Sequence, residues 1–284
     1  MTISVIGLNH KSASIEVREK FSFTADNISL LLRRIKKCEQ ISEVIVVSTC
    51  NRTEIYVESQ SGIVDIKNWL LSEKEYKSFS KYLYTYEEED AIKHLFRVVA
   101  GLDSMVIGEN EVLGQVKSAY KIALENKTVD SKLKRLFEYS FSVAKNVRTN
   151  TDIGGNAISF MYTSILLIKK IFSAVDEKKC LLIGAGEMTQ LALKYLKSNN
   201  VHEITICNRK EEKGKRLAVD NNCKYSNLNN LSNIIHDFDI IITSTSSSLP
   251  LIGKGNIENA LEKRNNSSMV IIDLGVPRDV ESQI

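Results

Sequence analysis

The chain has 284 residues, of which 43% are hydrophobic, so it is long enough to bury one or two cores of ordinary size. Its charges nearly cancel, with 38 basic and 35 acidic residues, so composition alone indicates no particular class of partner. The five cysteines form no CxxC pair and no cluster with histidine, which argues against a disulfide framework and predicts no metal site. Reduced thiols, the lack of a basic leader and the lack of about 20 consecutive apolar residues predict a soluble, cytoplasmic protein.

Strand and helix patterns alternate in the first half of the chain. Residues 3–7 and 44–47 are apolar runs typical of strands, and "TEIYVES" alternates like a strand with one wet face. Apolar residues recur at helical spacing in "NISLLLRRIKKCEQ", and three more helical stretches follow it. These three stretches cover residues 90–100, 111–125 and 131–147. The pattern predicts a small α/β sandwich of the ferredoxin-like kind.

A polar, glycine-containing segment, "RTNTDIGGNAIS", interrupts the periodicity over residues 148–159 and predicts a connection between two domains. We therefore expect a first domain over residues 1–154 and a second over 155–284. After a helix over residues 159–175, short apolar strands alternate with helices of about a dozen residues. That alternation predicts a Rossmann-type, doubly wound parallel sheet in the second domain.

The string "LLIGAGEMTQLALKYL" joins a predicted strand to a predicted helix through two glycines. Gly184 would allow the tight turn, and Gly186 would let the backbone approach a pyrophosphate at the N-terminus of the helix. The third small position of the fingerprint holds Thr189, so an ordinary glycine turn is the alternative.

The next predicted strand ends in "NRK", where dinucleotide-binding domains carry the residue that contacts the ribose. An acid would hold the 2′-hydroxyl of NAD, whereas Arg209 and Lys210 could neutralise a 2′-phosphate, which favours NADP(H) over surface charges without a ligand. A later loop, "TSTSSSLP", could line a nicotinamide pocket or be an ordinary loop. The predicted cofactor-binding residues are Gly184, Ala185, Gly186, Glu187, Met188, Thr189, Asn208, Arg209 and Lys210.

Cys50 differs from the other cysteines because it follows an apolar strand and has polar neighbours. A thiolate is a competent nucleophile, and the guanidinium of nearby Arg52 could lower the pKa of the thiol. Cysteine is also a common small core residue, so the residues alone leave both interpretations open.

A second polar cluster lies in "HLFRVVAGLDSMVIGENEVLGQVK". His94, Ser104, Glu109 and Gln115 are spread among glycines there, which suits the wall of a pocket. A lone histidine is often a structural residue, so that alternative also stays open.

Together, "STCNRTEIY", "HLFRVVAGLDSMVIGENEVLGQVK", "LLIGAGEM" and "IIDLGVPRDV" closely resemble the glutamyl-tRNA reductase family. The resemblance extends along the whole chain, starting at "VIGLNHKSASIEVREKFSF". It implies that the first domain binds the glutamyl end of the tRNA and that the second binds NADPH. It also implies that Cys50 takes the glutamyl group as a thioester, which is then reduced to glutamate-1-semialdehyde, the first step of tRNA-dependent tetrapyrrole synthesis.

The resemblance also assigns roles to single residues. It makes Cys50 and His94 catalytic, with Arg52 suited to the side-chain carboxylate of glutamate and Glu109 suited to its α-amino group. The substrate-binding residues that it implies are Thr49, Cys50, Asn51, Arg52, Ser104, Glu109, Asn110, Glu111 and Gln115.

This sequence departs from the family in two places. It has Asn110 and Glu111 where the family commonly has Pro and Gln, and it ends before the family's long helix and dimerisation domain. In the family the resemblance implies a homodimer and, as a partner, glutamate-1-semialdehyde aminomutase. Two other functions stay open, a nucleotide-binding or tRNA-binding module without turnover and an NADP oxidoreductase of the shikimate-dehydrogenase type.

Overall fold

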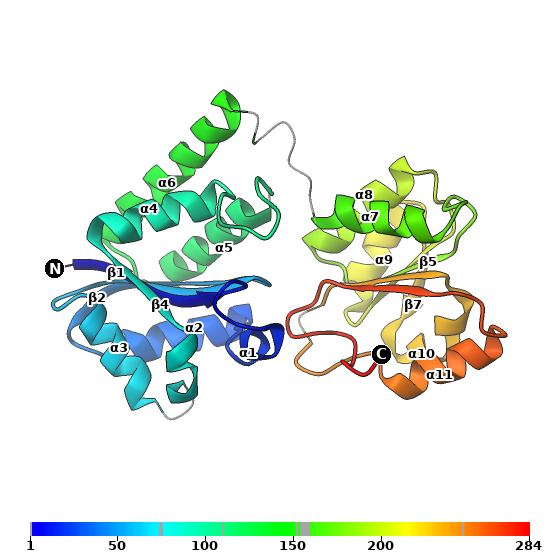
Figure 1. The fold of residues 1–284 in the computed structure, drawn as a ribbon, viewed down its shortest axis with the longest axis horizontal. Helices are drawn as coiled ribbons and strands as arrows, with labels where there is room; N and C mark the ends of the chain where they lie inside the picture. The colour runs from blue at the N-terminus through cyan, green and yellow to red at the C-terminus, as the bar shows by residue number, and fades with distance from the viewer. Residues whose placement is uncertain (1, 74–75, 110, 152, 154–159, 246) are drawn as a thin grey trace. The chain divides into compact units, whose positions relative to one another are not determined.

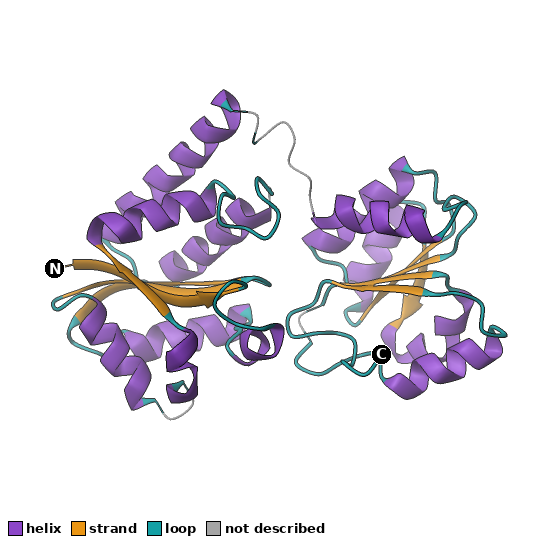
Figure 2. Cartoon of the chain, viewed as in Figure 1, coloured by secondary structure: helices purple, strands orange, loops and turns teal. Residues whose placement is uncertain are grey.

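Two β-sheets of different kinds organise the chain, one antiparallel and one parallel (Figure 2). The structure is a computed structural model that describes residues 2–73, 76–109, 111–151, 153, 160–245 and 247–284. It divides into two compact units, Met1–Ser159 and Phe160–Ile284. The predicted boundary between residues 154 and 155 lies outside the described residues.

The first unit is built on four antiparallel strands in the order β2-β3-β1-β4. Every residue of β3 is buried because helices cover both faces of the sheet, α1 to α3 on one face and α4 to α6 on the other (Figure 1). This is the predicted ferredoxin-like α/β sandwich. The strands are β1 (Thr2–Asn9), β2 (Ile41–Ser48), β3 (Arg52–Ser59) and β4 (Tyr84–Glu87). The helices are α1 (Ile15–Lys20), α2 (Ala25–Ile35), α3 (Ile63–Ser72), η1 (Lys77–Tyr82), α4 (Glu88–Val99), α5 (Glu111–Glu125) and α6 (Ser131–Asn150).

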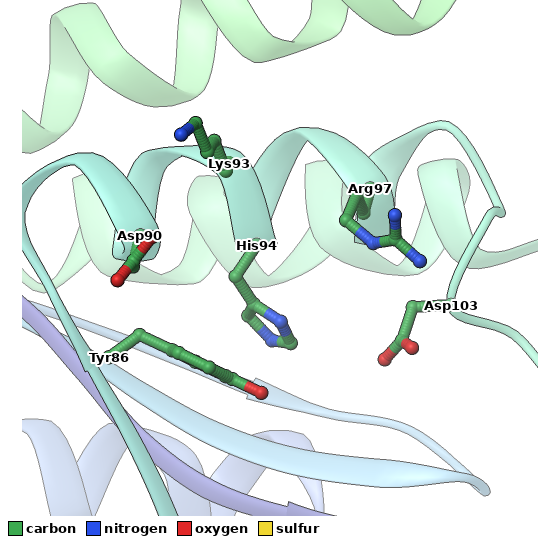
Figure 3. Close-up of a pocket in the computed structure, with 6 residues that line it drawn as sticks. All are labelled: Tyr86, Asp90, Lys93, His94, Arg97 and Asp103. Atoms are coloured by element: carbon green, nitrogen blue, oxygen red, sulfur yellow. The ribbon is translucent and has the colours of Figure 1, made fainter.

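The edge strand β4 and the helix α3 were not expected from the sequence. β4 reads "YTYE" and is mostly exposed, so it lacks the apolar run that predicts a buried strand. It forms because its backbone pairs antiparallel with β1 over Ser4 to Gly7, a contact between distant segments. This strand matters for the site because it places Tyr86 beneath α4 (Figure 3) and brings both Tyr84 and Tyr86 into ring contact with His94.

The second unit holds five parallel strands in the order β7-β6-β5-β8-β9. Helices α7, α8 and α9 cover one face and α10 and α11 the other, each with its own apolar core (Figure 1). This is the predicted Rossmann-type sheet. The strands are β5 (Cys180–Ile183), β6 (Ile204–Asn208), β7 (Lys224–Asn227), β8 (Ile240–Thr243) and β9 (Val270–Asp273). The helices are α7 (Phe160–Ile171), α8 (Glu187–Ser198), α9 (Glu211–Asp220), η2 (Leu228–Asn230), α10 (Leu231–Ile234), η3 (Ile235–Asp237) and α11 (Lys254–Lys263).

The order in which strands are added to this sheet reverses at β5. The strands β6 and β7 extend the sheet on one side of β5, and β8 and β9 extend it on the other side. Ligands of open α/β sheets bind at such a switch point, outside the carboxyl ends of the strands. There the loop after β8 meets the glycine turn after β5, and the Ser244 amide donates a hydrogen bond to the Ile183 carbonyl at 2.9 Å. No described helix has an apolar stretch long enough to cross a bilayer.

Gly184 occupies a position in this turn that only glycine fits. Its φ is +117°, and a Cβ there would lie 2.3 Å from the Ser244 carbonyl oxygen. Gly186, the N-cap of α8, has φ −86°, and a Cβ there would meet nothing within 4 Å.

We predict that Gly184→Ala destabilises the second unit by about 1–3 kcal/mol or more, because of the strained φ and the clash. Gly186→Ser, which has room and keeps a capping residue, should change stability by less than about 1 kcal/mol. Thermal unfolding of both variants measures the difference, and equal midpoints would contradict the interpretation of this turn.

Candidate active site

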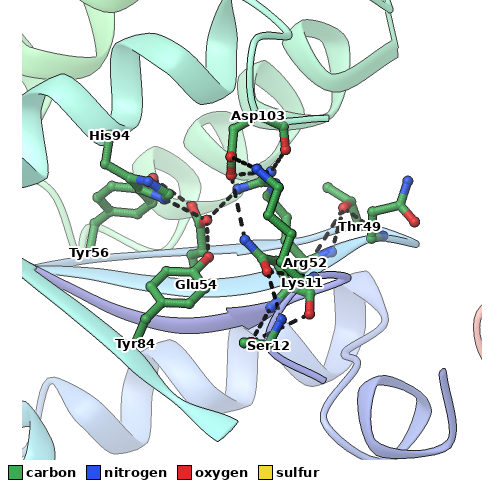
Figure 4. Close-up of polar contacts among 11 residues, drawn as sticks. Lys11, Ser12, Thr49, Arg52, Glu54, Tyr56, Tyr84, His94 and Asp103 are labelled. Atoms are coloured by element: carbon green, nitrogen blue, oxygen red, sulfur yellow. Dashed lines mark hydrogen bonds and ion pairs between the residues drawn. The ribbon is translucent and has the colours of Figure 1, made fainter. Parts of the chain in front are cut away.

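Cys50 lies in the short turn that joins β2 to β3. Hydrogen bonds of Thr49 hold this turn (Figure 4). The Thr49 amide donates to the Arg52 carbonyl at 2.8 Å, and the Thr49 hydroxyl accepts from the amides of Asn51 and Arg52, both at 3.2 Å. The apolar run of β2 and the alternation of β3 thus end in a turn that fixes the backbone of Cys50. A reacting side chain is best presented on such a fixed support.

Arg18 binds this turn, a contact that was not predicted from the sequence. Its Nη1 donates to the Cys50 carbonyl at 2.6 Å and to Asn51 Oδ1 at 3.3 Å. Burial, followed by the negative charge of Glu109, raises the pKa of the Cys50 thiol to about 11, with Glu111 adding to the rise and Arg18 opposing it. The free thiol is therefore protonated at neutral pH.

The prediction that Arg52 lowers the pKa of the Cys50 thiol is wrong. The Arg52 side chain is only 1% exposed and forms ion pairs with Glu54 at 2.6 Å and with Asp103 at 3.0 Å (Figure 4). Strand alternation explains this, because Arg52 and Glu54 lie two residues apart and their side chains share one face of β3. In this structure the guanidinium is thus bound by two carboxylates of the protein itself.

The carboxylate of Glu54 collects four hydrogen-bond donors within the core of the first unit (Figure 4). Arg52 Nη1 and the Tyr56 hydroxyl each lie 2.6 Å from it, the Tyr84 hydroxyl lies at 2.5 Å, and His94 Nε2 lies at 2.8 Å. Burial alone would raise the pKa of Glu54, but Arg52 and the hydrogen bond from His94 hold it far below its usual value. Glu54 is therefore an ionised, fully buried carboxylate.

This ionised carboxylate fixes the tautomer of His94. Glu54 carries no proton, so the hydrogen bond must be donated by His94 Nε2. In the neutral ring the proton acceptor is then Nδ1. The imidazole also stacks on Tyr86, with ring centroids 4.8 Å apart and an interplanar angle of 26°.

Asp103 closes the other side of the Arg52 guanidinium. Its Oδ1 pairs with Lys11 Nζ at 2.5 Å, its Oδ2 accepts from Arg52, and its backbone carbonyl also accepts from Arg52. Burial would raise the pKa of Asp103, but Lys11 and Arg52 lower it. Asp103 was not among the predicted site residues. Its place beside Ser104 in the loop after α4 was the one available hint.

Two acidic residues at the end of the loop after α4, Glu109 and Glu111, act on the Cys50 thiol. Burial raises the pKa of the Glu109 carboxyl, a hydrogen bond with Ser104 lowers it, and the charge of Glu111 raises it further. The backbone carbonyl of Glu109 accepts a hydrogen bond from Arg148 at 2.7 Å. Ser104 Oγ is buried with no partner of good hydrogen-bond geometry among the described residues. Glu111 begins α5 and Gln115 follows one turn later, half-buried on the same side.

The structure thus gathers some of the predicted site residues and leaves others apart. The charges of Glu109 and Glu111 act on the Cys50 thiol, while His94 and Arg52 belong to the Glu54 cluster. Asn110 lies outside the described residues.

A cavity of about 390 Å³ opens beside His94, between α4 and the edge strand β4 (Figure 3). It is lined by Tyr86, Asp90, Lys93, His94, Arg97 and Asp103. Of these, the prediction of site residues included His94 alone. The helical spacing of Asp90, Lys93 and Arg97 around it was the signal that could have found the others.

The predicted cofactor residues lie at the switch point of the second unit. The space beside Gly186 is open, and the Thr189 hydroxyl is buried without a hydrogen-bond partner among the described residues. Arg209 and Lys210 are exposed after β6, where Asn208 Nδ2 donates to the Lys210 carbonyl at 2.7 Å. An open approach to a helix N-terminus next to two cations fits a phosphorylated dinucleotide. Ala185 is buried in the turn, Glu187 is exposed and Met188 is half-buried.

Two hydroxyls of the predicted nicotinamide loop are used within the protein. Thr243 Oγ1 donates to Asp273 at 2.9 Å, and the Thr245 hydroxyl pairs with buried Asp279, which also accepts from the Thr245 amide at 2.8 Å. These hydrogen bonds stabilise the loop. The backbone and the serines of the loop are therefore the groups that we propose to line a nicotinamide pocket.

Comparisons with known proteins agree along the whole chain. Residues 6–151 match the family described as the N-terminal domain of glutamyl-tRNAGlu reductase, and residues 166–284 match the family described as shikimate / quinate 5-dehydrogenase. Glutamyl-tRNA reductase of Pseudoalteromonas translucida is 43% identical over all of this chain and 69% of its own length. The chain belongs to the glutamyl-tRNA reductase family.

Other members of the family agree with this assignment. Glutamyl-tRNA reductase of Aliivibrio salmonicida is 42% identical, again over all of this chain and 69% of its own. The solved structure of glutamyl-tRNA reductase from Methanopyrus kandleri is 28% identical, with a TM-score of 0.50, over 99% of this chain and 68% of its own. The family and the fold class predicted from the sequence are therefore confirmed. The shikimate-dehydrogenase interpretation accounts for the second unit alone.

We predict that Glu109→Gln makes the resting thiol more reactive, because it removes a negative charge that raises the pKa of Cys50. The rate of iodoacetamide alkylation at pH 8 should rise about threefold to tenfold, measured on the Cys50 peptide by mass spectrometry. Glu125→Gln, an exposed change at the end of α5, is the control and should have no effect. An unchanged or lower rate in Glu109→Gln would contradict the assigned cause.

Proposed function

We propose that this chain reduces glutamyl-tRNA with NADPH to glutamate-1-semialdehyde, through a thioester on Cys50. The observation that carries the proposal is the pairing, in one family member, of a cysteine held in a fixed turn with a dinucleotide-type switch point. A thioester carbonyl is weakly stabilised by resonance and accepts hydride more readily than an oxygen ester. Sulfur at position 50 therefore suits an acyl intermediate on the way to an aldehyde.

In the first step the thiolate of Cys50 attacks the ester carbonyl carbon of the glutamyl group. A carbon–sulfur bond forms, the carbon–oxygen bond to the ribose breaks, and the ribose oxygen takes a proton as the tRNA leaves. When bound, NADPH would supply the hydride that adds to the thioester carbonyl. The carbon–sulfur bond then breaks, which releases the aldehyde and returns the thiolate of Cys50.

The acidic surroundings of the thiol suggest how the substrate activates it. With a pKa of about 11, roughly one thiol in ten thousand is ionised at pH 7. Burial is the largest cause of this high pKa, and the charges of Glu109 and Glu111 add to it. The α-ammonium group of a glutamyl ester would pair with these two carboxylates and remove their part of the rise. Thiolate formation would then be coupled to the arrival of the correct substrate.

His94 is the proposed proton carrier at the ribose oxygen. Its Nε2 is held by Glu54, so Nδ1 is the atom that can take up a proton and return it. The ionised Glu54 would stabilise the imidazolium formed between those steps. Arg52, Thr49, Asn51, Ser104 and Gln115 are proposed to shape the pocket for the glutamyl group.

The chemistry of the product suggests a partner enzyme. An α-amino aldehyde is reactive, which favours its direct transfer to an enzyme that consumes it, such as glutamate-1-semialdehyde aminomutase. We also propose a cytoplasmic location.

We predict that Cys50→Ser abolishes NADPH oxidation with glutamyl-tRNA and forms no covalent glutamyl adduct on the protein. NADPH binding, measured by fluorescence, should be unchanged because the cofactor residues lie in the second unit. Cys223→Ser is the control and should keep full turnover. A Cys50→Ser protein that still turns over would remove the thioester mechanism, and a wild-type protein without turnover would favour a binding module.

The two cations after β6 should set the choice of cofactor. We predict that Arg209→Gln combined with Lys210→Gln raises KM for NADPH about tenfold or more and leaves KM for NADH nearly unchanged. Steady-state kinetics with both cofactors measures the ratio. A matched double change at exposed Lys213 and Arg216 on α9 is the control. Equal effects on NADPH and NADH would contradict the assignment of a 2′-phosphate site.

A further inference from the structure

We infer that the cavity beside His94 is the subsite for the terminal nucleotide of the tRNA, the leaving group of the first step. This inference rests on the proposed function and names the part of the substrate that the cavity receives. The cavity lies between α4 and β4, next to the Glu54 cluster (Figure 3).

The lining offers an aromatic surface for a base. Tyr86 stacks on His94 through its ring and is still 38% exposed, an unusual state for a large ring beside a buried cluster. Nucleobases stack on such rings, and stacking depends little on which base is bound. One face of Tyr86 is taken by His94, so a base would stack on the other face, one ring away from the histidine proposed to protonate the ribose oxygen.

The charges of the lining are arranged for a phosphate and a ribose. Lys93 and Arg97 are exposed on consecutive turns of α4. Within the described part of the chain Arg97 forms no ion pair, and Lys93 pairs with exposed Glu89. Of the two carboxylates, Asp103 is already neutralised by Lys11 and Arg52. Arg97 is therefore the cation of the lining that stays available for a phosphate.

Asp90 is the remaining carboxylate of the lining. It is exposed at the first turn of α4, and a carboxylate in this setting can accept from a ribose hydroxyl. A ring, a carboxylate and two cations around one cavity match the base, ribose and phosphate of a single nucleotide.

The cavity is connected to the reacting cysteine through Asp103. This residue lines the cavity and also pairs with Arg52, two residues after Cys50 in the same turn. A glutamyl group reaching toward Cys50 and a nucleotide beside His94 would thus lie on either side of one ion pair. The ester bond between them would fall where both the thiol and the histidine are needed.

The test compares two substrates in the wild-type chain and in variants of the cavity. Tyr86→Ala and Arg97→Gln should each lower kcat/KM for glutamyl-tRNA about tenfold, as expected for one stacked base or one phosphate contact. With a small glutamyl thioester that carries no nucleotide, and with the same NADPH, both variants should act within about twofold of wild type. The trinucleotide CCA should inhibit the wild type and inhibit both variants more weakly.

Matched controls come from the same unit. Tyr139→Ala changes another exposed tyrosine, on α6, and Arg33→Gln changes an exposed arginine of α2, which covers the opposite face of the sheet (Figure 1). Both should leave the two substrates unaffected. Equal losses with glutamyl-tRNA and with the small thioester would overturn the inference, since the cavity would then serve the glutamyl group or the fold.

Two other results would also overturn it. The first is unchanged kinetics in Tyr86→Ala and Arg97→Gln with both substrates. The second is the absence of CCA inhibition. A wild-type chain that reduces neither substrate would instead refute the proposed function, so the two failures are distinguishable.

Discussion

The buried ion pair between Glu54 and Arg52 is the interaction on which the rest of the site depends. Both side chains are almost fully removed from water, with 0% and 1% of their surfaces exposed. Such charges are tolerated only when each is paired and its remaining hydrogen bonds are satisfied. Here two tyrosines and a histidine complete the shell of Glu54, and Asp103 completes that of Arg52. Loss of one member would leave a buried charge uncompensated.

This network also decides how charge is distributed around the cysteine. Arg52 is paired with Glu54 and Asp103. Burial, followed by the negative charge of Glu109, raises the pKa of the Cys50 thiol, with Arg18 opposing the rise and Glu111 adding to it. The resting cysteine is therefore protected from adventitious electrophiles. A cationic group on the substrate would offset the negative charge of Glu109 and Glu111, so that the thiol becomes reactive only with the ligand in place.

The sequence was sufficient for elements with strong local patterns and insufficient for contacts between distant segments. The apolar run before Cys50 and the glycines around Ala185 predicted a strand-end cysteine and a nucleotide-type turn, and the structure has both. The direction of Arg52 could not be predicted, because it depends on a loop 51 residues away. Arg18 and Tyr86 were missed for the same reason. The former sits on a six-residue helix, and the latter lies on a polar edge strand that forms only by pairing with β1.

If Glu54 acts on the reaction through His94, as proposed, the two residues should behave as one unit in a double-mutant cycle. Single-turnover rates of thioester formation would be measured in wild type, Glu54→Gln, His94→Asn and the double variant, with folding checked by circular dichroism. The account predicts that the double variant is no slower than the slower single variant, because both changes remove one linked unit. Losses that multiply would show two independent contributions and would contradict it.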